Sequence, residues 1–260
     1  MKQESGDEAD SLVDEHAQPL LEHLAELRSR ILRAVLAVLI VFFPLFYVAN
    51  ELYAFISAPL RAVLPEGSSM IATEVASPFL TPFKLALVMA FFIAIPYVLH
   101  QIWSFVAPGL YSHEKRLAVP LLVSSILLFY AGMAFAYFAV FPLVFAFLTG
   151  VGPSDVAIMT DINAYLEFVL KLFFAFGFAF EIPVATLLLV ISGATTVDSL
   201  KAKRPYVVVG CFVLGMLLTP PDMISQVLLA LPMWMLYEAG IFFARFVRAR
   251  TAEGDDGASS

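Results

Sequence analysis

Long runs of apolar residues, separated by short polar stretches, dominate this chain. A helix rises about 1.5 Å per residue, so a run of about 20 residues crosses the roughly 30 Å hydrocarbon core of a bilayer. Because the apolar positions are continuous rather than alternating, they predict helices and disfavour a β-barrel. We expect six membrane-spanning helices, at about residues 31–48, 83–106, 117–148, 164–192, 206–218 and 224–243.

Three of these predicted spans differ from a simple helix of bilayer length. Pro96 lies inside the second span, where it removes a backbone donor and is expected to kink the helix. The third span, of about 32 residues, must tilt or project beyond the bilayer. The fifth, of about 13 residues, covers only about 20 Å, and we hypothesise that lipid thins beside it or that a partner covers the deficit.

The segments around the first span are amphipathic or polar. Residues 19–33 place leucine and isoleucine on one helical face and charged side chains on another, which predicts a lead-in helix that continues into the first span. The polar, proline-containing stretch 49–82 is predicted to be an external loop with a short amphipathic helix near 51–60. We expect one membrane domain over 19–248, flanked by a disordered acidic tail over 1–18 and a disordered tail over 249–260.

The composition agrees with an all-α polytopic membrane protein, since 61% of the 260 residues are hydrophobic and 14% are charged. Cys211 is the single cysteine, so an intrachain disulfide is excluded. Residues 1–19 lack the basic n-region of a cleavable signal peptide, and the first span is expected to act as its own insertion signal. The net charge is −7, and many of the acidic residues lie in the two tails. The composition does not imply a nucleic-acid partner.

Lysine and arginine predict the orientation, because short loops rich in these residues stay in the cytoplasm. With six spans, both chain ends, the second loop and the fourth loop share one side of the membrane. That side carries twelve of the fifteen basic residues, the exceptions being Arg61, Lys84 and Lys171. The amino and carboxyl termini are therefore predicted to be cytoplasmic.

No signature of catalysis, nucleotide binding or metal binding is present in the sequence. There is no P-loop, no GxGxxG, no HExxH and no metal-spaced cysteine pair, and the four histidines lack ligand spacing. We therefore predict no catalytic residue, cofactor or metal site, and the chain is not expected to be an enzyme.

Two carboxylates, Glu26 in the lead-in helix and Glu114 in the second loop, are predicted to lie near the cytoplasmic membrane surface. A carboxylate accepts two parallel hydrogen bonds from a guanidinium, so such a pair suits a ligand with adjacent arginines. The alternative is local pairing of Glu26 with Arg30 and of Glu114 with Lys115 or Arg116. Each such pair stabilises the protein by roughly a few tenths of a kcal/mol. Spacing alone favours the local pairs.

Glu181 is predicted to lie close to the middle of the fourth span. An ionisable residue at that depth costs about 2.5–3.5 kcal/mol on insertion scales and is a candidate functional group. The alternative is a protonated side chain bonded to a neighbouring helix. Nearer the outer end of the same span, Glu167 and Lys171 are predicted to form an ion pair at i, i+4.

Six motifs along the chain carry a resemblance to a known family. They are HLAELRSR at 23–30, ASPFLTPFKL at 76–85, FVAPGLYSHEKR at 105–116, FEIPV at 180–184, KRPYVVVG at 203–210 and MLLTPPD at 216–222. In this order, and over about residues 19–248, the chain closely resembles TatC, the multispanning receptor subunit of the bacterial twin-arginine translocase.

This resemblance implies a function. It implies a concave bundle of kinked helices in the bacterial inner membrane that recognises signal peptides with consecutive arginines. It further implies export of folded proteins, powered by the proton-motive force, in a hetero-oligomer of several copies with the single-span proteins TatB and TatA.

The resemblance also extends to individual positions. Glu26, Arg28, Phe105 and Glu114 match the cytoplasmic signal-peptide site of the family, and Glu181 matches its polar intramembrane position on the concave side.

Further matches concern partners and loops. Met216, Thr219 and Gln226 match positions where TatB and TatA are thought to dock, and Gln226 is placed to hydrogen-bond a partner helix. Pro59 and Asp222 match sensitive positions of the external loops.

Two departures from the family pattern affect its fine specificity. Ser112 stands where close relatives often have a basic residue, and Glu167 with Lys171 stands where an apolar or small residue is more usual. An alternative from another class is a proton-coupled transporter or channel that uses Glu181. It would predict inverted repeats, whereas the chain shows no internal repeat at a fixed period.

Overall fold

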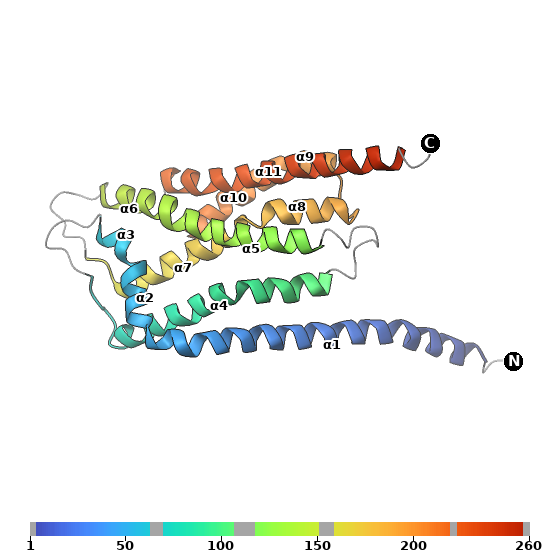
Figure 1. Ribbon diagram of the computed structural model, residues 1–260, viewed down its shortest axis with the longest axis horizontal. Coiled ribbons are helices and arrows are strands. Elements are labelled where there is room, and N and C mark those ends of the chain that lie inside the picture. The colour runs from blue at the N-terminus through green and yellow to red at the C-terminus, as the bar shows by residue number, and fades with distance from the viewer. Residues whose placement is uncertain (1–3, 63–69, 107–117, 151–158, 219–222, 257–260) are drawn as a thin grey trace.

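The chain is almost entirely helical in the residues that the computed structural model describes, which are 4–62, 70–106, 118–150, 159–218 and 223–256. Figure 1 shows its long helices running side by side in a bundle. The helices are α1 (Glu4–Tyr47), α2 (Ala49–Ile56), α3 (Ala58–Arg61), α4 (Ser77–Val106), α5 (Ala118–Phe135), α6 (Phe141–Gly150), α7 (Ile162–Ala179), α8 (Ile182–Ile191), α9 (Val197–Ala202), α10 (Arg204–Leu218) and α11 (Met223–Asp256).

Five helical segments of the described chain are long and apolar enough to cross a membrane. They are Leu24–Tyr47, Ser77–Phe105, Val119–Phe147, Ile162–Ile191 and Gln226–Phe246. These segments coincide with predicted spans one to four and six. The predicted fifth span corresponds to α10, a shorter apolar helix whose 15 residues extend about 22 Å.

Both chain ends lie at one end of the bundle (Figure 1). Helix α9, the end of α4 and the start of α5 also lie at this end. We call it the terminal end. The opposite end, which we call the distal end, holds α2, α3, the end of α6 and the start of α7. The grouping agrees with the connectivity that the sequence predicted.

Helix α1 begins at Glu4 and α11 ends at Asp256. This differs from the expectation of disordered tails over 1–18 and 249–260. Extending an existing helix avoids the cost of nucleation, and both stretches contain alanine and glutamate, which favour helix.

Two spans change their helical geometry next to a proline. Phe180 and Glu181 separate α7 from α8, because Pro183 has no N–H to donate to the carbonyl of Ala179. A π-helical turn, Ala136–Val140, joins α5 to α6 just before Pro142. Helix α4, by contrast, runs without interruption through Pro82 and Pro96.

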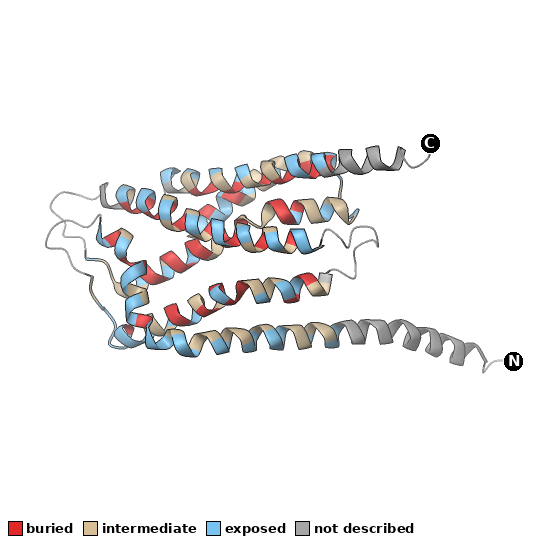
Figure 2. Cartoon of the chain, viewed as in Figure 1, coloured by how far each residue is buried: buried red, intermediate tan, exposed pale blue. Residues whose placement is uncertain are grey.

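Aromatic side chains fill the centre of the bundle, where Phe92, Phe129 and Phe176 are fully buried. Figure 2 shows buried residues along α4, α5 and α7. The glycines of this core bring helices together, because a Cβ on Gly132 would lie 2.4 Å from the carbonyl oxygen of Phe176. We infer that any larger residue at this position would push α5 away from α7.

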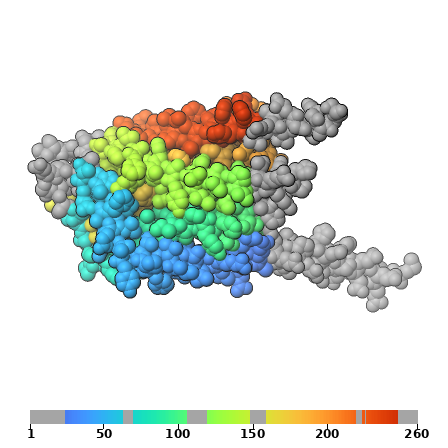
Figure 3. All heavy atoms as spheres, viewed as in Figure 1, coloured from blue at the N-terminus to red at the C-terminus, as the bar shows by residue number. Residues whose placement is uncertain are grey.

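Helix α1 lies along the edge of the bundle, against α4 (Figure 3). No residue of its apolar segment Leu24–Tyr47 is buried within the described structure. Its contact with α4 is aromatic, with the ring of Phe42 5.3 Å and the ring of Phe46 5.9 Å from that of Phe83. Most of its apolar surface is therefore left to face lipid.

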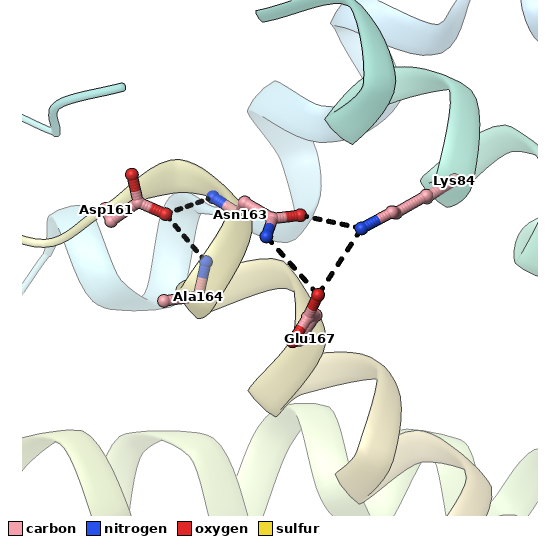
Figure 4. Close-up of polar contacts among 5 residues, drawn as sticks. All are labelled: Lys84, Asp161, Asn163, Ala164 and Glu167. Carbon is pink, nitrogen blue, oxygen red and sulfur yellow. Dashed lines mark hydrogen bonds and ion pairs between the residues drawn. The ribbon is translucent and has the colours of Figure 1, made fainter. Parts of the chain in front are cut away.

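Asp161 joins the two loops at the distal end. Its Oδ1 accepts hydrogen bonds from the N–H groups of Asn163 and Ala164, both at 2.9 Å, and caps α7 (Figure 4). Its Oδ2 accepts from the N–H of Thr73 at 2.9 Å and from the Thr73 hydroxyl at 2.7 Å. These bonds, first that from Ala164, hold the pKa of Asp161 at about 2, below its usual 3.8.

The same end carries an ion pair between α4 and α7 (Figure 4). Lys84 Nζ donates to Glu167 Oε1 at 3.3 Å and to Asn163 Oδ1 at 3.1 Å. The predicted pair of Glu167 with Lys171 is wrong, because Lys84 reaches the carboxylate from the neighbouring helix. Lys171 makes no ion pair within the described residues.

Removing the Asp161 carboxylate should lower stability in a pH-dependent way. Since its pKa is lower in the folded protein than in the unfolded chain, its contribution is fully present above about pH 5 and is lost as the pH falls towards about 2. We expect Asp161→Ala to melt at a lower temperature than wild type in detergent at neutral pH. The difference should shrink between about pH 5 and pH 2.

Thr73→Val is the matched comparator, because it removes the hydroxyl donor but keeps the backbone donor. Its effect should be smaller than that of Asp161→Ala at neutral pH. A melting-temperature difference for Asp161→Ala that stays constant down to about pH 2 would contradict this assignment.

Candidate functional site

The terminal end holds the described residues of the predicted peptide site. Glu26 and Arg28 lie on α1, and Phe105 lies in the last turn of α4. Glu114 and Ser112 lie outside the described residues.

The packing of α1 on α4 sets the relative positions of these residues. The two helices run antiparallel, with Phe42 at the level of Phe83. This register brings Glu26 to about the level of Leu99, so Phe105 lies roughly 9 Å nearer the terminal end. Side chains of both helices therefore border the same stretch of the terminal end.

Glu26 already has a cationic partner in the structure. Arg30 donates to Glu26 Oε1 from Nε at 3.0 Å and from Nη2 at 2.5 Å, so the local pair considered from the sequence is present. The side chain of Glu26 is 42% exposed, whereas that of Arg30 is 20% exposed. Both bonds go to one oxygen, and Oε2 accepts no hydrogen bond from the described residues. A second guanidinium can approach that oxygen from solvent.

Glu181 lies at the break between α7 and α8 and is half-buried. Its Oε1 is buried and has no hydrogen-bond donor among the described residues. Ser125 of α5 is close enough to interact with the carboxyl group. The Ser125 hydroxyl in turn accepts a hydrogen bond at 3.4 Å from Nε1 of Trp103, near the end of α4.

These polar groups form a chain from the centre of the bundle to the base of the terminal end. The sequence analysis did not connect Trp103 or Ser125 to Glu181. A serine pair inside an otherwise apolar span, Ser124 and Ser125, was the available signal.

Two of the three predicted docking residues, Met216 and Gln226, lie on α10 and α11. Met216 is exposed on α10. Gln226 Nε2 donates one hydrogen bond to the carbonyl oxygen of Phe212 at 3.0 Å. The amide keeps a second N–H and its oxygen, so the hydrogen bond to a partner helix stays a prediction. The two helices approach closely here, because a Cβ on Gly215 would lie 3.3 Å from Gln226 Cγ.

Of the remaining predicted residues, the structure describes only Pro59. Pro59 occupies the first turn of the short helix α3. Thr219 and Asp222 lie outside the described residues.

An ion pair that the sequence analysis did not single out joins α10 to α11 near the terminal end. Arg204 Nη2 donates to Glu238 Oε2 at 2.5 Å. The neighbouring Tyr237 hydroxyl donates to the carbonyl oxygen of Leu200 at 2.8 Å and ties α9 to α11. A glutamate inside predicted span six was the signal for this pair.

The described part of the chain contains no group of three or more histidine, cysteine, aspartate or glutamate side chains that could hold a metal ion. The polar groups found here can bind and orient cationic ligands. They do not form a nucleophile and base pair.

Comparison with known proteins identifies the family. The family described as Sec-independent protein translocase protein (TatC) matches residues 22–232. The chain is 65% identical over 232 residues to the Sec-independent protein translocase protein TatC of Azotobacter chroococcum mcd 1, covering 89% of this chain and 91% of that one. It is 57% identical over 232 residues to the protein of the same name from Escherichia coli (strain K12), covering 89% and 90%.

A solved structure agrees with this likeness. The crystal structure of a twin arginine translocase receptor, TatC, superposes with a TM-score of 0.78 at 40% sequence identity, covering 86% of this chain and 98% of that one. The agreement in sequence and fold sets aside the alternative of a proton-coupled transporter. The chain belongs to the TatC family of Sec-independent protein translocase proteins.

Proposed function

We propose that this protein is the receptor subunit of a twin-arginine translocase and binds signal peptides with two consecutive arginines at its terminal end. The observation that carries the proposal is the state of Glu26. This carboxylate is exposed near a membrane surface, and one of its oxygens has no partner among the described residues. Family membership supplies the class of ligand.

The orientation follows from charge. Most lysines and arginines of the described chain lie toward the terminal end, whereas Arg61 and Lys84 lie toward the distal end. By the positive-inside rule, the terminal end faces the cytoplasm. In this proposal α10 is the fifth of six crossings of one membrane domain, 19–248, in the bacterial inner membrane.

Binding rests on the difference between arginine and lysine. A guanidinium of the peptide reaches Glu26 Oε2 while Arg30 keeps Oε1, and Glu114 supplies the second carboxylate. Arg28 borders the site, and Phe105 offers an apolar contact beside it. A lysine presents a single point charge and cannot form the paired hydrogen bonds. Because Glu26 is partly exposed, we assign it about 1 kcal/mol rather than the larger value of a buried pair.

Later steps involve other parts of the bundle. Glu181 provides a polar site at membrane depth, which Ser125 and Trp103 connect to the terminal end. TatB and TatA dock along α10 and α11, around Met216, Thr219 and Gln226, in a hetero-oligomer driven by the proton-motive force. Pro59 and Asp222 act in the external loops.

Peptide binding tests the proposal directly. We expect a labelled signal peptide with two arginines to bind the full-length protein in lipid nanodiscs more tightly than its two-lysine version. Glu26→Gln, which keeps the shape but removes the charge, should weaken binding of the arginine peptide about fivefold and reduce the preference for arginine. Glu114→Ala should act in the same direction. Fluorescence anisotropy measures all of these affinities.

Glu167→Gln is the matched control, because the Glu167 side chain is 49% exposed and is also paired with one cation, but lies at the distal end. It should leave both affinities unchanged. Equal binding of the two peptides by wild type would rule out the receptor proposal.

The length of α10 predicts a thinner bilayer beside it. A helix of about 22 Å cannot cross a core of about 30 Å with both ends at the headgroups unless the lipid thins. We expect spin labels at Tyr206→Cys and Met216→Cys, each in a Cys211→Ala background, to report shallow depths at the two surfaces. One label deep in hydrocarbon would contradict local thinning.

A further inference from the structure

An apolar groove lies between α7, α10 and α11 and carries a charge at one end. Its volume is about 650 Å³, within the range of small-molecule sites. Phe174 and Phe178 of α7, Leu214 of α10 and Met233 of α11 contribute to its walls. Phe178 and Leu214 are exposed, so the groove opens to the outside of the bundle rather than into its core.

Two charged residues line this groove, Glu167 and Lys171. Glu167 is held by Lys84 and Asn163, as Figure 4 shows, so its charge is already balanced. Lys171 is exposed and has no ion-pair partner among the described residues. A cation at the edge of an apolar, membrane-facing groove is favourable only with an anion or water beside it.

Lys171 lies at a depth from which its side chain can reach a lipid headgroup at the membrane surface beside α10. It lies about 14 Å along α7 from Ile162, which is deep for a bilayer of ordinary thickness. The facing helix α10 ends at Leu218, which also lines the groove. Because α10 is short, the membrane surface beside this groove lies closer to Lys171, within reach of its flexible side chain.

We propose that the groove binds a phospholipid with a net negative headgroup, whose phosphate pairs with Lys171 and whose acyl chain lies against Phe174, Phe178 and Leu214. One such molecule supplies both the anion and the flexible apolar chain that the groove lacks. A transmembrane helix of another protein would need an acidic side chain at one depth and a rigid apolar surface of matching shape. The lipid site does not depend on peptide binding at the terminal end.

Native mass spectrometry of the full-length protein tests this site. The protein is exchanged from vesicles of equal parts phosphatidylglycerol and phosphatidylcholine into mild detergent, and the retained lipid is counted. Wild type should retain phosphatidylglycerol in preference to phosphatidylcholine. Lys171→Met should lower its retention about fivefold, the effect of one lysine near an anionic headgroup, and Lys171→Arg should restore it.

Lys203→Met is the matched control, since Lys203 is an exposed lysine at the other end of the bundle. It should not change lipid retention. Leu214→Trp, which fills the groove but keeps Lys171, should lower retention as well, with the melting temperature reporting that the variant folds. Equal phosphatidylglycerol retention by wild type, Lys171→Met and Leu214→Trp would overturn the proposal.

A photoreactive amino acid at Leu214 identifies the occupant independently. In native membranes the expected adduct has the mass of one phospholipid. An adduct with another protein would assign the groove to a partner helix and overturn the lipid proposal.

Discussion

The hydrocarbon core of a membrane contains no water to satisfy backbone N–H and C=O groups, and the architecture of this protein depends on that constraint. It makes each long apolar run a helix, since only a helix satisfies its own backbone. Interruptions then require a specific cause. The break between α7 and α8 occurs where Pro183 removes a donor, and Glu181 stands at that break beside Ser125. Glu181 thus lies at membrane depth at a place where the helix is already interrupted.

Charge divides the bundle into two ends with different tasks. At the distal end Asp161 joins two loops and Lys84 pairs with Glu167, so these charges are used within the chain. At the terminal end Arg30 engages only one oxygen of Glu26, and we propose that the other oxygen binds the ligand. Exposure alone does not distinguish Glu26 from Glu167, which accepts hydrogen bonds from Lys84 of α4 and from Asn163 of its own helix, both at Oε1. The two carboxylates differ in that they lie at opposite ends of the bundle.

The length of the continuous apolar runs was sufficient to predict five of the spans and their order, because a bilayer imposes length and polarity directly on the sequence. The pair of Glu26 with Arg30 was also predictable, since it depends only on the spacing within one helix. Pairs between different helices were not predictable from the sequence. Lys84 reaches Glu167, and Gln226 reaches the carbonyl of Phe212, only because of the way the helices pack. The link from Trp103 to Ser125 likewise depends on tertiary structure. The helical tails instead extend α1 and α11 and follow from local helix propensity.

The central claim is that twin arginines are recognised at the terminal end, between α1 and the end of α4. Photo-crosslinking from a reactive residue placed beside the two arginines of a signal peptide tests it most directly. The account predicts adducts within residues 23–30 of α1 and at 103–106 of α4, which disappear with the two-lysine peptide. Adducts concentrated on α2 or α3 at the distal end, or unchanged by the lysine substitution, would contradict it.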